Sequence, residues 1–191
     1  DVCTLGHWCA FGAASPRSCP AGTFGNRTRL QAPAECEQCP RGHFCPEGTH
    51  TATVQPCPSG RWGASSGAVD YLCDGSCSAG HYCPAASTNS TAMPCLEGTF
   101  NPLGGGTGPE ACLAAEVGYF APRAASQQIA CTPPLTTLER GAGRVEDCLC
   151  SVGSFSLSAN ASNTTTCMDC EVDRLNCTEP GITVVSLHLK P

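Results

Sequence analysis

The residues with the most reactive side chains in this sequence are its 18 cysteines, which recur at short intervals. Thiols at such intervals either form disulfides or bind zinc as thiolates. Zinc-like spacing occurs at Cys36-x2-Cys39, Cys167-x2-Cys170 and Cys73-x3-Cys77. Nearly one residue in eleven is cysteine, which is typical of secreted disulfide scaffolds, and we therefore favour disulfides over zinc. A redox C-x-x-C site would need a surrounding βαβ pattern, which the sequence lacks.

Two short sequence phrases containing these cysteines repeat along the chain. The first phrase, C-x-x-G-H-[aromatic]-C, occupies residues 3–9, 39–45 and 77–83. The second phrase, C-x-x-G-x-[aromatic], occupies residues 19–24, 57–62 and 95–100. A polar, glycine-rich stretch follows each second phrase and ends at a further cysteine. The first phrase recurs after 36 and then 38 residues, which indicates a tandem repeat.

A fourth, degenerate copy of the first phrase suggests how the cysteines pair. At residues 115–121 the glycine and an aromatic remain, but both flanking cysteines are alanines, Ala115 and Ala121. Loss of both together is expected if they are partners, because loss of one would leave an unpaired thiol. The predicted pairs are Cys3–Cys9, Cys19–Cys36, Cys39–Cys45, Cys57–Cys73, Cys77–Cys83, Cys95–Cys112, Cys131–Cys148, Cys150–Cys167 and Cys170–Cys177. A crossed scheme, such as Cys36–Cys45 with Cys39–Cys57, is the alternative.

Large apolar residues are too few to build a conventional core. Leu, Ile, Val and Phe together number 30 of 191 residues, so burial alone would not offset the entropy of ordering the backbone. This argues against one large globular domain, an α/β enzyme or a helical bundle. We predict that each phrase glycine turns the chain with positive φ, and that each aromatic packs on a disulfide of its own or the next unit.

The predicted fold is a small disulfide-rich β fold of tandem cysteine-rich modules, stacked as an elongated rod with almost no helix. The units expected are residues 1–36, 37–73 and 74–112, a degenerate unit 113–148, and an atypical unit 149–191. The β-branched run at residues 181–189 predicts a strand. The abrupt first and last residues suggest a segment cut from a longer chain.

Histidine recurs at one position of the first phrase, as His7, His43 and His81. Such a series could bind metal or respond to pH, but Tyr119 takes the place in the degenerate copy, and we favour a turn or packing role. No catalytic motif such as G-x-S-x-G or HExxH is present. We therefore predict no enzyme activity, no catalytic or metal-binding residues, and no cofactor.

Charge and glycosylation signals bear on the partners and the compartment. The net charge of −6, with ten scattered basic residues, argues against nucleic acid as a partner. No apolar run approaches the ~20 residues of a membrane span. Cysteine content predicts an extracellular or cell-surface location. Five N-x-[ST] sequons predict N-linked glycans on exposed loops, at Asn26, Asn89, Asn160, Asn163 and Asn176.

The phrases C-P-x-G-T-[FW] and C-x-x-C-P-x-G-x-[FY]-C-P resemble the ephrin-receptor-like cysteine-rich repeat, an EGF-like module similar in appearance to the tumour-necrosis-factor-receptor repeat. Residues 3–112 carry the resemblance well, and residues 112–177 carry it in degenerate form. The last residues resemble the end of such arrays in large surface proteins of algae and other protists, including mastigoneme-type flagellar-hair proteins and apicomplexan cysteine-repeat modular proteins.

The repeat and the resemblance together predict a non-enzymatic structural segment of a larger secreted or cell-surface glycoprotein. It would act as a rod or spacer, in an extracellular or flagellar filament, with other extracellular chains or further repeats as partners. The alternative is a receptor ectodomain whose repeats bind a protein or glycan ligand. The module itself occurs in many contexts and does not choose between these roles.

Overall fold

A computed structural model of the chain describes residues 3–51, 53, 55–151, 153–158 and 165–169. The chain forms two compact units. Unit 1 comprises Asp1–Pro94 and Leu103–Ala111, and unit 2 comprises Cys95–Pro102 and Cys112–Pro191. The strand predicted at residues 181–189 lies outside the described residues.

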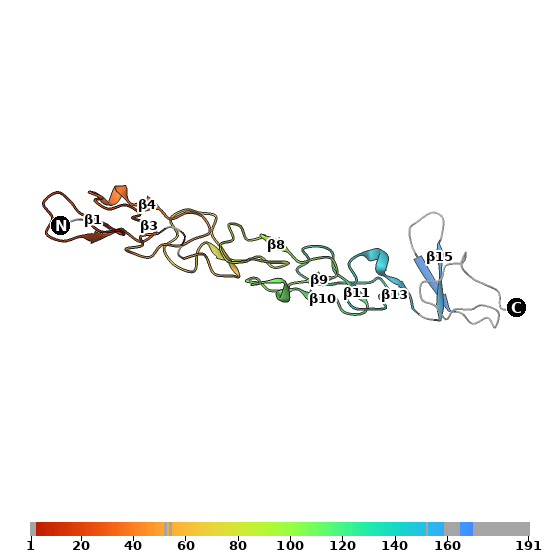
Figure 1. Ribbon diagram of the computed structural model, residues 1–191. Helices are drawn as coiled ribbons and strands as arrows, with labels where there is room; N and C mark the ends of the chain where they lie inside the picture. The colour runs from red at the N-terminus through yellow and green to blue at the C-terminus, as the bar shows by residue number, and fades with distance from the viewer. Residues whose placement is uncertain (1–2, 52, 54, 152, 159–164, 170–191) are drawn as a thin grey trace. The chain divides into compact units, whose positions relative to one another are not determined.

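Each sheet that the structure describes is a two-stranded antiparallel hairpin (Figure 1). Unit 1 contains β1 (His7–Trp8) with β2 (Arg17–Ser18), β3 (Thr23–Phe24) with β4 (Glu37–Gln38), β5 (Arg61–Trp62) with β6 (Gly75–Ser76), and β7 (His81–Tyr82) with β8 (Met93–Pro94). Unit 2 contains β9 (Thr99–Phe100) with β10 (Leu113–Ala114), β11 (Tyr119–Phe120) with β12 (Ile129–Ala130), β13 (Leu135–Thr136) with β14 (Leu149–Cys150), and β15 (Ser154–Ser158) with β16 (Thr165–Asp169).

Helical structure among the described residues is limited to three single 3₁₀ turns. These are η1 (Pro33–Glu35), η2 (Pro109–Ala111) and η3 (Val145–Asp147), and each directly precedes a cysteine that closes a long disulfide loop. The predicted class, a small disulfide-rich β fold with almost no helix, is confirmed.

One seven-residue backbone turn underlies all the hairpins. We name its copies motifs 1 to 9, and number the positions within each motif 1 to 7. They are residues 3–9, 19–25, 39–45, 57–63, 77–83, 95–101, 115–121, 131–137 and 150–156. The N–H of position 5 donates to the carbonyl of position 2, as from Thr23 to Pro20 at 3.0 Å.

Position 4 sets the form of this turn. Its glycine has φ between 75° and 89° in all motifs except motif 8, which is the conformation a type II turn requires at its third residue. The predicted positive φ is therefore confirmed. Motif 8 has Pro134 at position 4, joined to Pro133 by a cis peptide bond.

Motif 8 also differs in the register of its hairpin. In the six complete hairpins of motifs 1, 2 and 4 to 7, position 5 pairs with the residue that precedes the next motif, as His7 does with Ser18. In motif 8, Leu135 pairs instead with Cys150, which is position 1 of motif 9. The shift by one residue coincides with the loss of glycine from the turn.

Consecutive motifs are joined by a fixed set of four backbone hydrogen bonds. Between motifs 1 and 2, the N–H of Gly6 donates to the carbonyl of Gly25 and its own carbonyl accepts from Cys19, each at 2.8 Å. The N–H of Arg29 donates to the carbonyl of Cys3 at 3.1 Å. The N–H of Cys9 donates to the carbonyl of Leu30 at 2.8 Å. We call one such set a junction.

The same junction recurs between motifs 2 and 3, 3 and 4, and 4 and 5 in unit 1, and between motifs 6 and 7 in unit 2. One donor in each junction lies nine or ten residues after position 1 of the later motif and has positive φ. Gly48, Gly67 and Ala86 are examples. Motifs begin 16 to 20 residues apart, so the hydrogen-bonded unit is about half the repeat seen in the sequence. The five predicted domain ranges remain a prediction.

Cysteines and aromatics supply the small core. Position 1 is buried in all nine motifs, with at most 6% of the residue exposed. Trp8 packs against Leu30 and the Cys19–Cys36 disulfide, and Phe24 packs with the Cys39–Cys45 disulfide. In motifs 1 and 2 the aromatic therefore packs on the disulfide that begins in the next motif. This is one of the two predicted arrangements.

Substitution of Gly60 by alanine should destabilise the fold strongly. Gly60 has φ +84°, and a Cβ there would lie 2.6 Å from the carbonyl oxygen of Gly105. We expect a loss of about 1–3 kcal/mol from the unfavourable φ alone and a further loss from the overlap, measured by denaturant unfolding. Gly12→Ala is the matched control, because Gly12 has φ +77° but no atom within 4 Å of a Cβ. Equal losses in both variants would contradict the close approach.

Candidate functional site

The cysteines form eight disulfides among the described residues, and these join eight of the nine predicted pairs. Their Cα–Cα separations lie between 5.6 and 6.1 Å, within the usual range. The crossed alternative does not occur, since Cys36 bonds Cys19 and Cys39 bonds Cys45. The predicted Cys170–Cys177 pair lies outside the described residues.

In the two zinc-like spacings that lie wholly among the described residues, the cysteines belong to separate disulfides. Cys170, of the third spacing, lies outside the described residues. Cys73 bonds Cys57, whereas Cys77 bonds Cys83, so their thiols are not available together as thiolate ligands. Among the residues that the structure describes, no group of three or more His, Cys, Asp or Glu is placed to hold a metal ion.

Motif 7 retains its conformation without a disulfide. Ala115 and Ala121 are completely buried, like the cysteines they replace. The N–H of Ala115 donates to the carbonyl of Gly98 at 2.9 Å, and the carbonyl of Ala121 accepts from the N–H of Gly98 at 2.8 Å. These positions therefore require a small buried side chain and a paired backbone, and a sulfur atom is not essential to the junction.

The repeated histidines act within their own turns. Nδ1 of His7 lies 2.9 Å from the carbonyl oxygen of Leu5, and His43 and His81 make the same contact with Arg41 and Ala79. Because a carbonyl only accepts, Nδ1 carries the proton in each case. This geometry supports the turn role.

In motifs 2 and 6 a threonine hydroxyl at position 5 makes a similar hydrogen bond within its own turn. Thr23 donates through Oγ1 to the carbonyl of Pro20 at 2.6 Å, and Thr99 donates to that of Leu96 at 2.8 Å. Histidine and threonine at this position thus both tie a side chain to the turn. This shared role explains why the residue changes from phrase to phrase while the turn does not.

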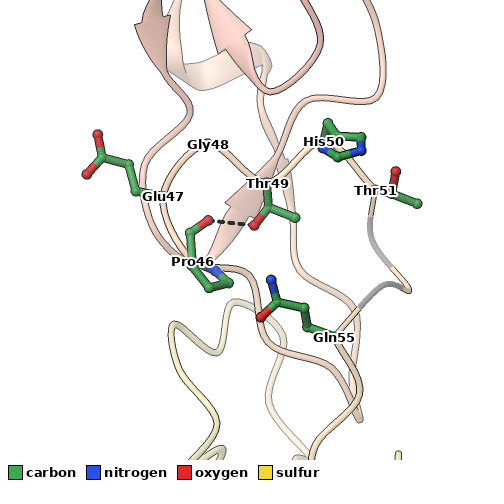
Figure 2. A pocket seen from close by; sticks show the side chains of 7 residues that line it. All are labelled: Pro46, Glu47, Gly48, Thr49, His50, Thr51 and Gln55. Atoms are coloured by element: carbon green, nitrogen blue, oxygen red, sulfur yellow. Dashed lines mark hydrogen bonds between the residues drawn. The ribbon is translucent and has the colours of Figure 1, made fainter.

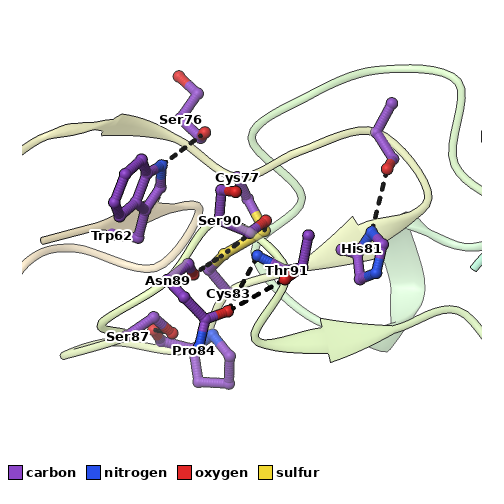
Figure 3. Close-up of a disulfide and its surroundings, with 11 residues drawn as sticks. Trp62, Ser76, Cys77, His81, Cys83, Pro84, Ser87, Asn89, Ser90 and Thr91 are labelled. Carbon is purple, nitrogen blue, oxygen red and sulfur yellow. Dashed lines mark hydrogen bonds between the residues drawn. A yellow bond between two sulfur atoms is a disulfide. The ribbon is translucent and has the colours of Figure 1, made fainter. Parts of the chain in front are cut away.

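Two of the five predicted glycosylation sites lie among the described residues. Asn26 and Asn89 are both exposed in loops, as expected for acceptor sites. Figure 3 shows Asn89 beside the Cys77–Cys83 disulfide, where its Oδ1 accepts from the N–H of Thr91 at 3.0 Å. Glycan attachment remains a prediction. Asn160, Asn163 and Asn176 lie outside the described residues.

A small hollow of ≈ 190 Å³ lies beside motif 3 and is lined by Pro46, Glu47, Gly48, Thr49, His50, Thr51 and Gln55. The Thr49 hydroxyl already donates to the carbonyl of Pro46 at 2.6 Å. Figure 2 shows the Glu47 carboxylate directed away from the other lining side chains. Among the described lining residues, no hydrogen bond joins Glu47, Thr49 and His50, so these three do not form a linked acid, base and nucleophile.

Two polar side chains in unit 2 have structural roles that the sequence did not reveal. The buried Thr137 hydroxyl accepts from the N–H of Gly118 at 2.8 Å, taking the place of a backbone carbonyl in the junction between motifs 7 and 8. Asp147 accepts from the backbone N–H groups of Arg144 and Gly143 at 2.9 and 2.8 Å. These donors hold the pKa of the Asp147 carboxyl below its ordinary value of 3.8.

Comparison of the chain with models of known protein families and with curated proteins finds no match. Its described part has no helix with the length and apolar character needed to cross a membrane.

Restoring cysteine at both degenerate positions should create a further disulfide. In the Ala115→Cys/Ala121→Cys variant we expect peptide mapping under non-reducing conditions to find the new bond. Closing a loop of about seven residues should raise the free energy of unfolding by about 2 kcal/mol. The single variants serve as controls, because each adds only an unpaired thiol. Two free thiols in the folded double variant would contradict the equivalence of motif 7 with motifs 3 and 5.

Proposed function

We propose that this chain is a non-enzymatic structural segment of a larger secreted or cell-surface glycoprotein, in which it serves as a disulfide-stapled rod or spacer. The chain is rich in disulfides, as extracellular proteins commonly are. The observation that carries the proposal is the junction. The same four hydrogen bonds join motifs 1 to 5 in succession in unit 1 and join motif 6 to motif 7 in unit 2, which favours a structure that is extended by adding motifs over one that enlarges a core.

Such a segment suits a role in which length matters more than a binding cavity. Its proposed partners are further repeats of the same kind or other extracellular chains, as in an extracellular or flagellar filament. N-linked glycans at exposed positions such as Asn26 and Asn89 would keep its flanks soluble. The resemblance to the ephrin-receptor-like repeat supports the same class of role.

Small-angle X-ray scattering of the deglycosylated chain tests the rod. A compact domain of this length has a radius of gyration of about 16 Å, and the unfolded chain about 47 Å. We expect a value well above the compact one, with the linear cross-section region typical of a rod. Reduction of the disulfides should abolish that region and move the value toward the unfolded one. A radius near the compact value in the oxidised chain would contradict the proposal.

A further inference from the structure

Motif 1 presents a set of backbone groups that no other described residue satisfies. In the junctions described above, the later motif contributes two donors and two acceptors to its predecessor. The corresponding groups of motif 1 are the N–H groups of Cys3 and Gly12 and the carbonyls of Cys9 and Ala13. None of these four forms a hydrogen bond with the part of the chain that the structure describes. We call this set the leading edge.

The same groups are paired in the following motifs. In motif 3, Cys39 and Gly48 donate to Gly22 and Cys19, each at 2.9 Å, and Cys45 and Thr49 accept from Gly22 and Gly25 at 2.7 and 2.9 Å. Motifs 2, 4 and 5 repeat this pattern. The leading edge of motif 1 is therefore complementary to the backbone groups that Gly6, Gly22, Gly42 and Gly60, with the rest of their motifs, present to the following motif.

Side chains around the leading edge show the same open face. Position 7 is buried in motifs 2 to 8, but Cys9 is only half-buried. A Cβ on Gly12 would meet nothing within 4 Å, whereas one on Gly48 would meet Ser18 at 3.7 Å and one on Gly67 would meet Gly22 at 3.7 Å. Phe11, next to Gly12, is fully exposed. Exposed apolar surface beside unpaired backbone groups is typical of a binding surface.

The chemistry of the junction restricts what can occupy this edge. One residue of the occupant must have positive φ and must present both its N–H and its carbonyl to the leading edge. A glycine at that position of the occupant also permits the close backbone approach seen between Gly60 and Gly105. It must also supply a second turn motif before that one, because Gly48 lies over Gly6, two motifs earlier. Pro134 lacks the N–H, so motif 8 of a second copy cannot fill the place.

We propose that the leading edge of motif 1 binds a pair of consecutive C-x-x-G turn motifs carried by another cysteine-rich segment. The Cys3 and Gly12 amides would donate to that pair, Cys9 and Ala13 would accept from it, and Phe11 would be covered. This surface is defined by backbone complementarity and does not depend on the role proposed above.

Amide hydrogen exchange, followed by NMR, tests the proposal in two steps. In the oxidised chain, we expect the protection factor of Gly12 to be at least about ten-fold lower than that of Gly48, which makes the equivalent bond. The second step uses a fusion in which a copy of residues 39–76 directly precedes Cys3. In this fusion the copied motif 4 stands before motif 1 at the same spacing as the original motif 4 stands before motif 5, which begins at Cys77. In the fusion, the protection of Cys3 and Gly12 should rise to that of Gly48.

The matched control is the same fusion with Gly60→Ala in the copied segment only. This change should leave Gly12 unprotected, because it disturbs the turn that faces motif 1. Peptide mapping of the copied disulfides shows whether the copy has folded; if it has not, the longer copy of residues 19–76 replaces it. Equal protection of Gly12 and Gly48 in the chain itself would overturn the proposal. So would an unprotected Gly12 beside a copy whose disulfides are correctly formed.

Discussion

Over motifs 1 to 5 in unit 1, and between motifs 6 and 7 in unit 2, the fold depends on pairing the backbone of one turn motif with the backbone of the next. A net contribution of about 0.5–1.5 kcal/mol per hydrogen bond makes each junction a modest interaction, and the fold is stable because junctions recur. They require a position-4 residue that turns the chain with positive φ and leaves both its N–H and its carbonyl facing the following motif. Glycine meets both conditions in Gly6, Gly22, Gly42 and Gly60.

Disulfides and aromatics complete what the junctions begin. The disulfides restrict the unfolded chain, and their sulfur atoms occupy the buried space that Leu or Val would fill in a larger core. Trp8 and Phe24 each cover the disulfide of the next motif, so sequence neighbours share one small apolar cluster. Motif 7 shows that one short disulfide can be absent from a complete junction: Ala115 and Ala121 replace it, and all four hydrogen bonds with motif 6 are present.

Much of this architecture could be predicted from the sequence, because it depends on which residue types occupy particular positions. The paired loss of cysteine at 115 and 121 indicated the pairing, and the invariant phrase glycines indicated the turn. The junction was not predictable in this way, because it is made by backbone atoms that every residue carries. Its half-length period was hidden by the alternation of cysteine and other small residues at position 7, such as Cys45 and Gly63. The one-residue register shift at Leu135 and the substitution of a side-chain hydroxyl at Thr137 depend on local geometry that spacing alone does not encode.

The central claim is that junctions and disulfides together replace an apolar core. Amide exchange at the position-4 glycines, before and after reduction, tests it most directly. The account predicts that Gly22, Gly42 and Gly60 are similarly protected in the oxidised chain, because each donates the same bond to the next motif. It also predicts that dithiothreitol removes the protection of all three together. Glycine amides that exchange freely in the oxidised chain, or that stay protected after full reduction, would contradict it.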